Sequence, residues 1–171
     1  ISRNLESIMS EHSPAEQLFD PDDLVAVARA IDGLEDFGDD SYREPLEQLC
    51  WSLQHEARLN AIGGPILRQR LLDILATRLR VQYYLQRFPE IAEEEISAPL
   101  FIVGLPRSGT SILFELLSQD PDVGVPLMWE ALQPCPPPEA ATYTTDARIA
   151  QADKLFTQWN RVAPEFASMH E

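Results

Sequence analysis

The residues best suited to chemistry lie in one short loop, Gly104-Leu105-Pro106-Arg107-Ser108-Gly109-Thr110-Ser111. Its two glycines have the spacing of the phosphate-binding loop G-x-x-x-x-G-K-[ST], but Thr110 stands where that motif has a lysine. Enzymes that cleave nucleoside triphosphates use this lysine on the β- and γ-phosphates, so its absence argues against ATP hydrolysis. The loop retains backbone N–H groups, hydroxyls and one guanidinium, which together predict a cradle for a single phosphate group. The residues expected to bind it are Pro106, Arg107, Ser108, Gly109, Thr110 and Ser111.

A strand and a helix are expected to position this loop. Leu100-Phe101-Ile102-Val103 is rich in β-branched and aromatic residues and has no polar face, which is typical of a central parallel strand. A helix is predicted over 109–119, and its inward-facing residues are Ile112, Leu113, Leu116 and Leu117. One strand cannot form a sheet, so the others are expected either within 123–127 or, as we favour, in sequence outside this chain. The predicted fold class is α/β, with a parallel sheet flanked by helices.

Start and stop signals predict helices in the first hundred residues. Asp20-Pro21-Asp22-Asp23 is predicted to start a helix, and Gly33 to close it. Capping boxes are predicted at Ser13-Pro14-Ala15-Glu16 and at Ser41-Tyr42-Arg43-Glu44. The helix that begins at the second box is expected to run to the Gly63-Gly64 break.

Further helices complete the prediction. Pro65 opens a longer one that runs to about Phe88, where Pro89 stops it, and another covers 145–162. We therefore predict a helical subdomain at 1–97 and the start of a phosphate-binding domain at 98–171. The chain as it stands is expected to be predominantly α-helical, with the first strand, loop and helix of the α/β fold.

Composition excludes several classes of protein. The net charge of −15 has the opposite sign to that of a typical nucleic-acid-binding protein. No apolar run approaches the roughly 18 residues of a membrane span, so no transmembrane segment is expected. Cys50 and Cys135 have no metal-ligand spacing and form no disulfide framework, which makes a cytoplasmic location the default. The chain begins at Ile1 without an initiator methionine, so we expect its natural start to lie upstream.

The loop and the residues after it resemble a known family. The loop is followed by Asp120-Pro121, Trp129-Glu130 and Pro136-Pro137-Pro138, an order similar to the 5′-phosphosulfate loop region of bacterial sulfotransferases. These enzymes use 3′-phosphoadenosine 5′-phosphosulfate (PAPS). The upstream segment Gly33-Leu34-Glu35-Asp36-Phe37-Gly38-Asp39-Asp40-Ser41-Tyr42-Arg43-Glu44-Pro45-Leu46 is similar to their helical N-terminal region. The resemblance covers nearly the whole chain, but only the first part of a family member.

This resemblance implies a P-loop-like sulfotransferase fold and transfer of a sulfuryl group from PAPS to the hydroxyl of a small-molecule, lipid or sugar acceptor. Arg107 and the loop amides would stabilise the charge that develops on the leaving adenosine bisphosphate, with no metal. Ser111 replaces the usual threonine and keeps its hydroxyl. The family's ligands for the 3′-phosphate lie on elements later than Glu171. Oligomeric state is left open.

Glu130 is the residue that the resemblance implies as general base. The alternative is a carboxylate that hydrogen-bonds the backbone or orients Arg107. The histidines, His12, His55 and His170, are weaker candidates for the base. The tryptophans, Trp51, Trp129 and Trp159, are predicted to be core residues, and Trp129 is also a candidate for lining the acceptor pocket. Arg107 and Glu130 are thus the predicted catalytic pair.

Two other functions fit the same sequence. A kinase with a phosphate-binding loop could use Arg107 as its cation, and would then prefer ATP with Mg²⁺ to PAPS. A non-catalytic helical interaction module with a relic loop would fold well but bind no nucleotide. Nucleotide preference therefore separates the three hypotheses.

Overall fold

The computed structural model describes residues 17–162, and its side chains are described as far as residue 157. Within these residues every regular element is a helix, which confirms the prediction of a predominantly helical chain. The contacts divide the chain into two compact units, Ile1–Phe88 and Pro89–Glu171, and each is described by itself. The domain boundary at 97/98 that composition suggests stays a prediction. The capping box at 13–16 lies outside the described residues.

Helix α3, Pro21–Asp32, has the ends that its sequence predicts. The side chain of Asp20 accepts a hydrogen bond from the backbone N–H of Asp23 at 2.8 Å, which satisfies one of the free donors of the first turn. Gly33 ends the helix in the left-handed region, with φ +66°. A residue with a Cβ is strained in that conformation, so glycine is favoured there.

Helix α4, Arg43–His55, begins differently from the prediction. A short 3₁₀ helix, η1 (Asp40–Tyr42), precedes it, and the side chain of Asp39 accepts the N–H of Ser41 at 2.9 Å. Ser41 therefore lies inside the capped turn rather than before it. The capping box predicted at Ser41 is wrong, because an aspartate two residues upstream supplies the cap.

Helix α5, Gly63–Arg87, is the longest described helix and confirms the prediction of a long helix before Pro89. The side-chain oxygen of Asn60 accepts the N–H groups of Ile62 and Gly63 at 3.1 and 2.7 Å. The turn around Asn60 thus separates α5 from α4, which ends at His55, earlier than its sequence suggests.

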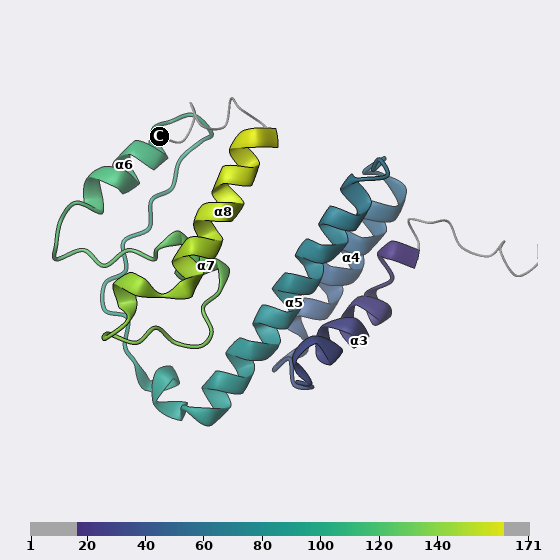
Figure 1. Cartoon of the computed structure of the whole chain (residues 1–171), viewed down its shortest axis with the longest axis horizontal. Helices are drawn as coiled ribbons and strands as arrows, with labels where there is room; N and C mark the ends of the chain where they lie inside the picture. Colours follow the sequence, from purple (N-terminus) through teal and green to yellow (C-terminus); the bar gives the residue numbers. More distant parts are fainter. Residues whose placement is uncertain (1–16, 163–171) are drawn as a thin grey trace, which may run out of the picture. The chain divides into compact units, whose positions relative to one another are not determined.

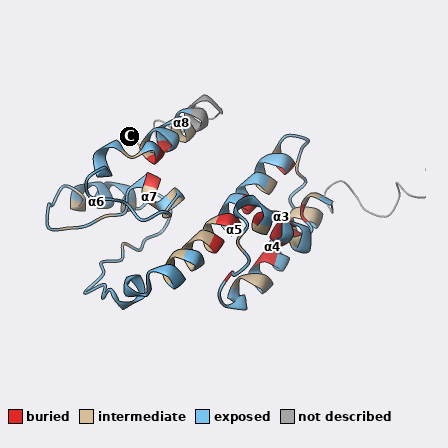
Figure 2. Ribbon diagram, turned by 60° about the horizontal axis from the view of Figure 1, so that its bottom comes forward, coloured by how far each residue is buried: buried red, intermediate tan, exposed pale blue. Residues whose placement is uncertain are grey.

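The first unit encloses a core of its own (Figures 1 and 2). Helices α3 and α5 lie side by side, and α4 also packs against α3. Their facing stripes, together with the preceding Phe19 and the connecting Phe37, form one buried cluster. Its members on the helices are Leu24, Val25, Ala28, Leu46, Cys50, Leu71, Leu72, Leu75 and Leu79. Trp51, predicted to be core, is instead 48% exposed and stacks on His55.

Arginines of this unit pair with carboxylates on other elements. Arg68 and Arg80 of α5 reach Asp23 and Asp32 of α3, at 2.5 and 2.6 Å. Arg43 at the start of α4 forms a third such pair, with Asp22. These pairs are exposed or half-exposed, so each contributes little to stability. They nevertheless show that part of the acidic excess neutralises cations between helices.

The second unit contains the 3₁₀ helices η2 (Pro89–Glu93) and η3 (Tyr143–Thr145) and three α-helices. The α-helices are α6 (Thr110–Leu117), α7 (Met128–Leu132) and α8 (Ala147–Val162). Helices α7 and α8 pack against each other, whereas α6 has no extensive packing partner among the described helices. The helix predicted over 145–162 is confirmed.

The strand expected at 100–103 is absent from the described structure, and so is the alternative at 123–127. Phe101 and Val103 are 80% and 90% exposed, and Ile112 and Leu116 of α6 also face solvent. A strand exists only when a neighbour takes its backbone hydrogen bonds, and no second strand is available within 17–162. The prediction that the α6 residues face inward is therefore also wrong for this chain.

Candidate anion-binding site

A tight turn shapes the loop between residue 103 and α6. The carbonyl of Leu105 accepts both the backbone N–H of Ser108, at 3.2 Å, and its hydroxyl, at 2.6 Å. Arg107 and Gly109 both have left-handed backbone conformations, with φ +66° and +91°. Glycine adopts this conformation freely, but arginine rarely does. The turn at Ser108 thus holds Arg107 in a conformation that an unconstrained chain would avoid.

Gly104 is required by close packing inside the loop. A Cβ at this position would lie 2.5 Å from the Ser108 hydroxyl oxygen and 2.8 Å from the Thr110 methyl carbon. Both distances are below van der Waals contact. The loop therefore folds back on Gly104, and a larger residue there would displace the two side chains that follow Arg107.

Free backbone donors lie at the start of α6. The first intrahelical hydrogen bond joins the N–H of Leu113 to the carbonyl of Gly109, at 3.0 Å. The N–H groups of Gly109, Thr110, Ser111 and Ile112 make no hydrogen bond to any residue that the structure describes. Free N–H groups at a helix start, with the positive end of the helix dipole, form a ready site for an anion. The donor set therefore fits a phosphate or sulfate group.

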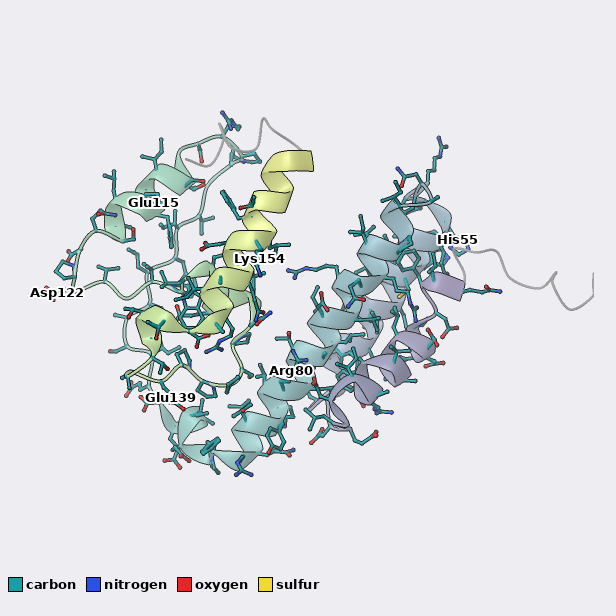
Figure 3. All side chains as sticks on the ribbon, viewed as in Figure 1. His55, Arg80, Glu115, Asp122, Glu139 and Lys154 are labelled. Carbon is teal, nitrogen blue, oxygen red and sulfur yellow. The ribbon has the colours of Figure 1, made fainter. Side chains whose placement is uncertain are left out.

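The side chains of the loop contribute unequally. The guanidinium of Arg107 is exposed and has no ion pair or hydrogen bond within residues 17–157, so it is available to a ligand. The proton of the Ser108 hydroxyl is already directed at the Leu105 carbonyl. Thr110 and Ser111 instead line an open cavity of about 410 Å³, together with Ile102, Phe114 and Glu115. Figure 3 labels Glu115 on α6. Sequence reasoning did not single this carboxylate out.

Glu130, the predicted base, lies on α7 and holds its carboxylate between two donors. One oxygen accepts the N–H of Leu127 at 2.7 Å, and the other accepts the hydroxyl of Tyr143 at 3.0 Å. In the described residues no hydrogen bond or ion pair joins Glu130 to Arg107. The structure thus brings the loop residues together but does not pair the two predicted catalytic residues with each other.

A buried arginine holds the surroundings of Glu130. Arg148 of α8 is 8% exposed and binds both carboxylate oxygens of Asp146, at 2.9 and 2.6 Å. It also donates to the carbonyls of Gln133 and Pro136, both at 2.7 Å, and lies over the ring of Trp129 at 4.7 Å. We call this cluster of Trp129, Asp146 and Arg148 the arginine latch. It ties the 133–136 segment to α7 and α8.

Tyr143 and the two charged members of the arginine latch, Asp146 and Arg148, are functional candidates that sequence reasoning missed. The available signal was Asp146-Ala147-Arg148 at the start of a predicted helix, shortly after a run of prolines. An aspartate there can accept the second N–H that follows it, as Asp146 does from Arg148 at 2.9 Å. Arg148 hydrogen bonds lower the pKa of Asp146 to about 2. No local rule, however, links Tyr143 to Glu130.

The remaining candidates are placed as follows. His55 belongs to the first unit and is exposed, and its Nδ1 lies 2.8 Å from the carbonyl of Trp51. Trp129 is 5% exposed, as the core prediction requires. His12 and His170 lie outside the described residues, and so does the side chain of Trp159. Within 17–162 no cluster of three metal-ligating side chains is found, and no described helix has the length and apolarity to cross a membrane.

Comparisons with known proteins identify the family. A model of the sulfotransferase family matches residues 99–171. The crystal structure of the sulfotransferase STF1 from Mycobacterium tuberculosis has 37% sequence identity and a TM-score of 0.72, over 84% of this chain and 40% of that one. The sulfotransferase STF9 from Mycobacterium avium has 29% identity and a TM-score of 0.71, over 83% of this chain and 36% of that one. No match was found among curated proteins.

The chain thus spans less than half the length of these solved relatives. The family match covers the loop, α6, α7 and α8, while the structural matches extend over the helical first unit as well. On both grounds, the chain belongs to the bacterial sulfotransferase family.

Proposed function

We propose that this chain is part of an enzyme that moves a sulfuryl group from PAPS to an acceptor hydroxyl. The observation that carries the proposal is the set of N–H groups at the start of α6, with the Arg107 side chain in the loop just before it, all without a hydrogen-bond partner among the described residues. Membership of the sulfotransferase family supports it. The 5′-phosphosulfate end of the donor would lie against the loop 104–111.

The chemistry follows from the charges. The acceptor oxygen forms a bond to sulfur as the bond from sulfur to the bridging oxygen of the donor breaks. The electron pair of that bond leaves with adenosine 3′,5′-bisphosphate, so negative charge grows on its 5′-phosphate. Free N–H groups and the Arg107 guanidinium would stabilise this charge more in the transition state than in the ground state. Arg107 is therefore proposed as a catalytic residue.

The acceptor proton needs a base, and we propose Glu130 for this role. The support is its carboxylate, which retains lone pairs beyond the two hydrogen bonds from Leu127 and Tyr143. The proton would move from the acceptor hydroxyl to this carboxylate as the new oxygen–sulfur bond forms. A hydroxyl on a small molecule, lipid or sugar fits this scheme.

Donor binding can be tested on this chain by NMR. Adenosine 3′,5′-bisphosphate without Mg²⁺ should shift the amide signals of Gly109, Thr110 and Ser111, and Arg107→Ala should weaken the binding. Arg70→Ala, at an exposed position on α5, is the control. Shifts that need ATP with Mg²⁺ would favour the kinase, and no shift with either nucleotide would favour the interaction module.

Turnover is measured in a version that spans the full length of the solved relatives. Arg107→Ala should lower kcat by roughly 10²–10³ and weaken donor binding less, since its charge matches the leaving group. Equal losses of kcat and of donor affinity would mean that Arg107 only binds the donor.

Glu130→Gln should keep donor affinity but lower kcat by roughly 10²–10⁴. An unchanged rate would place the base elsewhere.

A further inference from the structure

Tyr143 is the one side chain that donates a hydrogen bond to Glu130 among the described residues. It lies on η3, between the proline-rich segment and α8, 13 residues along the chain from Glu130. Its hydroxyl meets one carboxylate oxygen at 3.0 Å, while the N–H of Leu127 meets the other at 2.7 Å. Two donors on two different oxygens fix both the direction and the rotation of a carboxylate.

The ring of Tyr143 is itself held. It contacts Trp129 edge-on, with centroids 5.4 Å apart, and Trp129 carries the Arg148 guanidinium on its ring at 4.7 Å. Arg148 is anchored by Asp146 and by two backbone carbonyls. The arginine latch therefore supports the Tyr143 ring rigidly, and the phenol hydroxyl approaches Glu130 from a fixed direction.

We propose that Tyr143 is a positioning residue that holds the Glu130 carboxylate in the orientation needed to take the acceptor proton. This inference rests on the proposed role of Glu130 as base. A free glutamate side chain samples several rotamers, and fixing it in advance lowers the entropy lost on reaching the transition state. The Tyr143 bond does this without occupying the carboxylate fully.

We call the two hydrogen bonds that Glu130 accepts, from Tyr143 and from the N–H of Leu127, the clamp. The clamp is compatible with catalysis only if the carboxylate keeps a free lone pair for the acceptor proton. An ionised carboxylate has about four acceptor positions, two on each oxygen. Tyr143 and the Leu127 N–H occupy one position on each oxygen, so one position on each oxygen stays available to an incoming hydroxyl. A clamp by two donors therefore orients Glu130 and still allows it to accept a proton.

The charges around the pair are consistent with this arrangement. The hydrogen bond to Glu130 is the main cause that raises the pKa of Tyr143, because a nearby carboxylate favours the neutral phenol that donates to it. The other charged groups of this cluster are the Arg148 guanidinium and the Asp146 carboxylate, and the Cys135 thiol lies close to Arg148. Tyr143 therefore stays a donor throughout the neutral range.

The test combines a titration that needs no activity with a rate measurement. Tyrosine labelled with ¹³C at the ζ carbon reports the pKa of Tyr143 in the 171-residue chain, assigned with Tyr143→Phe. Glu130→Gln should bring this pKa down towards the ordinary value of about 10. Tyr143→Phe keeps the aromatic ring against Trp129, so the free energy of unfolding should be unchanged. In a longer form of the protein that covers the full length of the solved relatives, Tyr143→Phe should lower kcat about tenfold with little change in KM.

Tyr84→Phe is the matched control, because the Tyr84 hydroxyl has no hydrogen bond in the described residues. If Glu130→Gln leaves the Tyr143 titration unchanged, the clamp does not exist, whatever the enzyme does. Suppose that the titration shows the pairing and that Glu130→Gln abolishes turnover. If Tyr143→Phe then turns over normally, the positioning role of Tyr143 is refuted, while the role of Glu130 as general base is supported. If Glu130→Gln turns over normally, the proposed base fails first, and the inference fails with it.

Discussion

The first unit and the loop with α6 use similar residues in opposite ways. Helices α3, α4 and α5 turn their apolar stripes towards one another and bury them, whereas α6 and the segment before it leave theirs in solvent (Figure 2). Arginines follow the same division. Arg68 and Arg80 are paired with carboxylates of a neighbouring helix, but Arg107 has no partner in the described chain.

The comparison separates residues that stabilise the fold from residues that are available to a ligand. A cation that is paired between helices has little remaining capacity to bind an anion. An exposed guanidinium without a partner in the described chain keeps that capacity. The buried Arg148 belongs with the structural group, although it lies in the second unit. Within that unit the arginine latch is therefore the stable part, and the loop with α6 is the open part.

The largest expected effect is in the core of the first unit. Leu79 of α5 is fully buried, so Leu79→Ala should lower the free energy of unfolding of this unit by about 3 kcal/mol, through lost burial and a cavity. Ile74→Ala, on the same helix at 51% exposure, is the control and should cost far less. Hydrogen exchange resolved by segment measures both. Equal losses would mean that the core does not carry the stability of this unit.

Breaking the arginine latch should have the next largest effect, and in the second unit only. Arg148→Ala leaves the carbonyls of Gln133 and Pro136 without this donor and removes the guanidinium from Asp146, which keeps only the backbone N–H of residue 148. This unit should therefore be destabilised by about 2–4 kcal/mol. Lys154→Ala, at an exposed position on α8, is the control. Hydrogen exchange should rise over 128–157 and not in α3 to α5. A rise in both units would contradict the division between them.

The latch also predicts a loss of stability in acid. The pKa of Asp146 in the folded chain is about 2, below its ordinary value, because Arg148 stabilises the ionised form. The resulting stabilisation is complete above about pH 4 and is lost as the pH falls from about 4 to 2. Asp146→Asn should remove this part of the acid sensitivity of the second unit, and Asp153→Asn should not. The measurement is unfolding by urea at a series of pH values.

A smaller effect is expected at the start of α3. Asp20→Ala removes the acceptor for the N–H of Asp23 and should cost about 1 kcal/mol in the first unit. Asp20→Asn keeps an acceptor oxygen and should cost much less. Urea unfolding of the two variants makes the comparison. If both behave like the parent chain, the aspartate cap does not contribute.

The smallest effect is expected on α6. Ile112 is 68% exposed, so Ile112→Ser removes almost no burial and should change the free energy of unfolding by less than about 0.5 kcal/mol. Segment-resolved hydrogen exchange again provides the measurement. A loss approaching that of Leu79→Ala would show that α6 is covered in solution, and would weaken the contrast between the two regions.

Local signals explain how much of this protein is predictable from sequence. The helix start at Asp20-Pro21, the stop at Gly33 and the end of α5 before Pro89 depend on residues within one turn of each other, and all three are found as predicted. The loop 104–111 and the segments around it carried the resemblance to the sulfotransferase family, which the family model confirms, whereas the role of the loop in binding stays a prediction. Helix α4 is the exception at both ends: Asp39 rather than Ser41 caps the turn before it, and the helix ends at His55 instead of running to Gly63-Gly64.

Most helix ends and the family could thus be inferred from the sequence, because they depend on residues a few positions apart. The partners of Glu130, the burial of Arg148 and the exposure of Trp51 became known from the packing of the folded chain. The folded chain also shows that 100–103 is not a strand, since a strand needs backbone partners from another segment. Each of these outcomes depends on groups that are distant in sequence, and no pattern within a short window contains their positions.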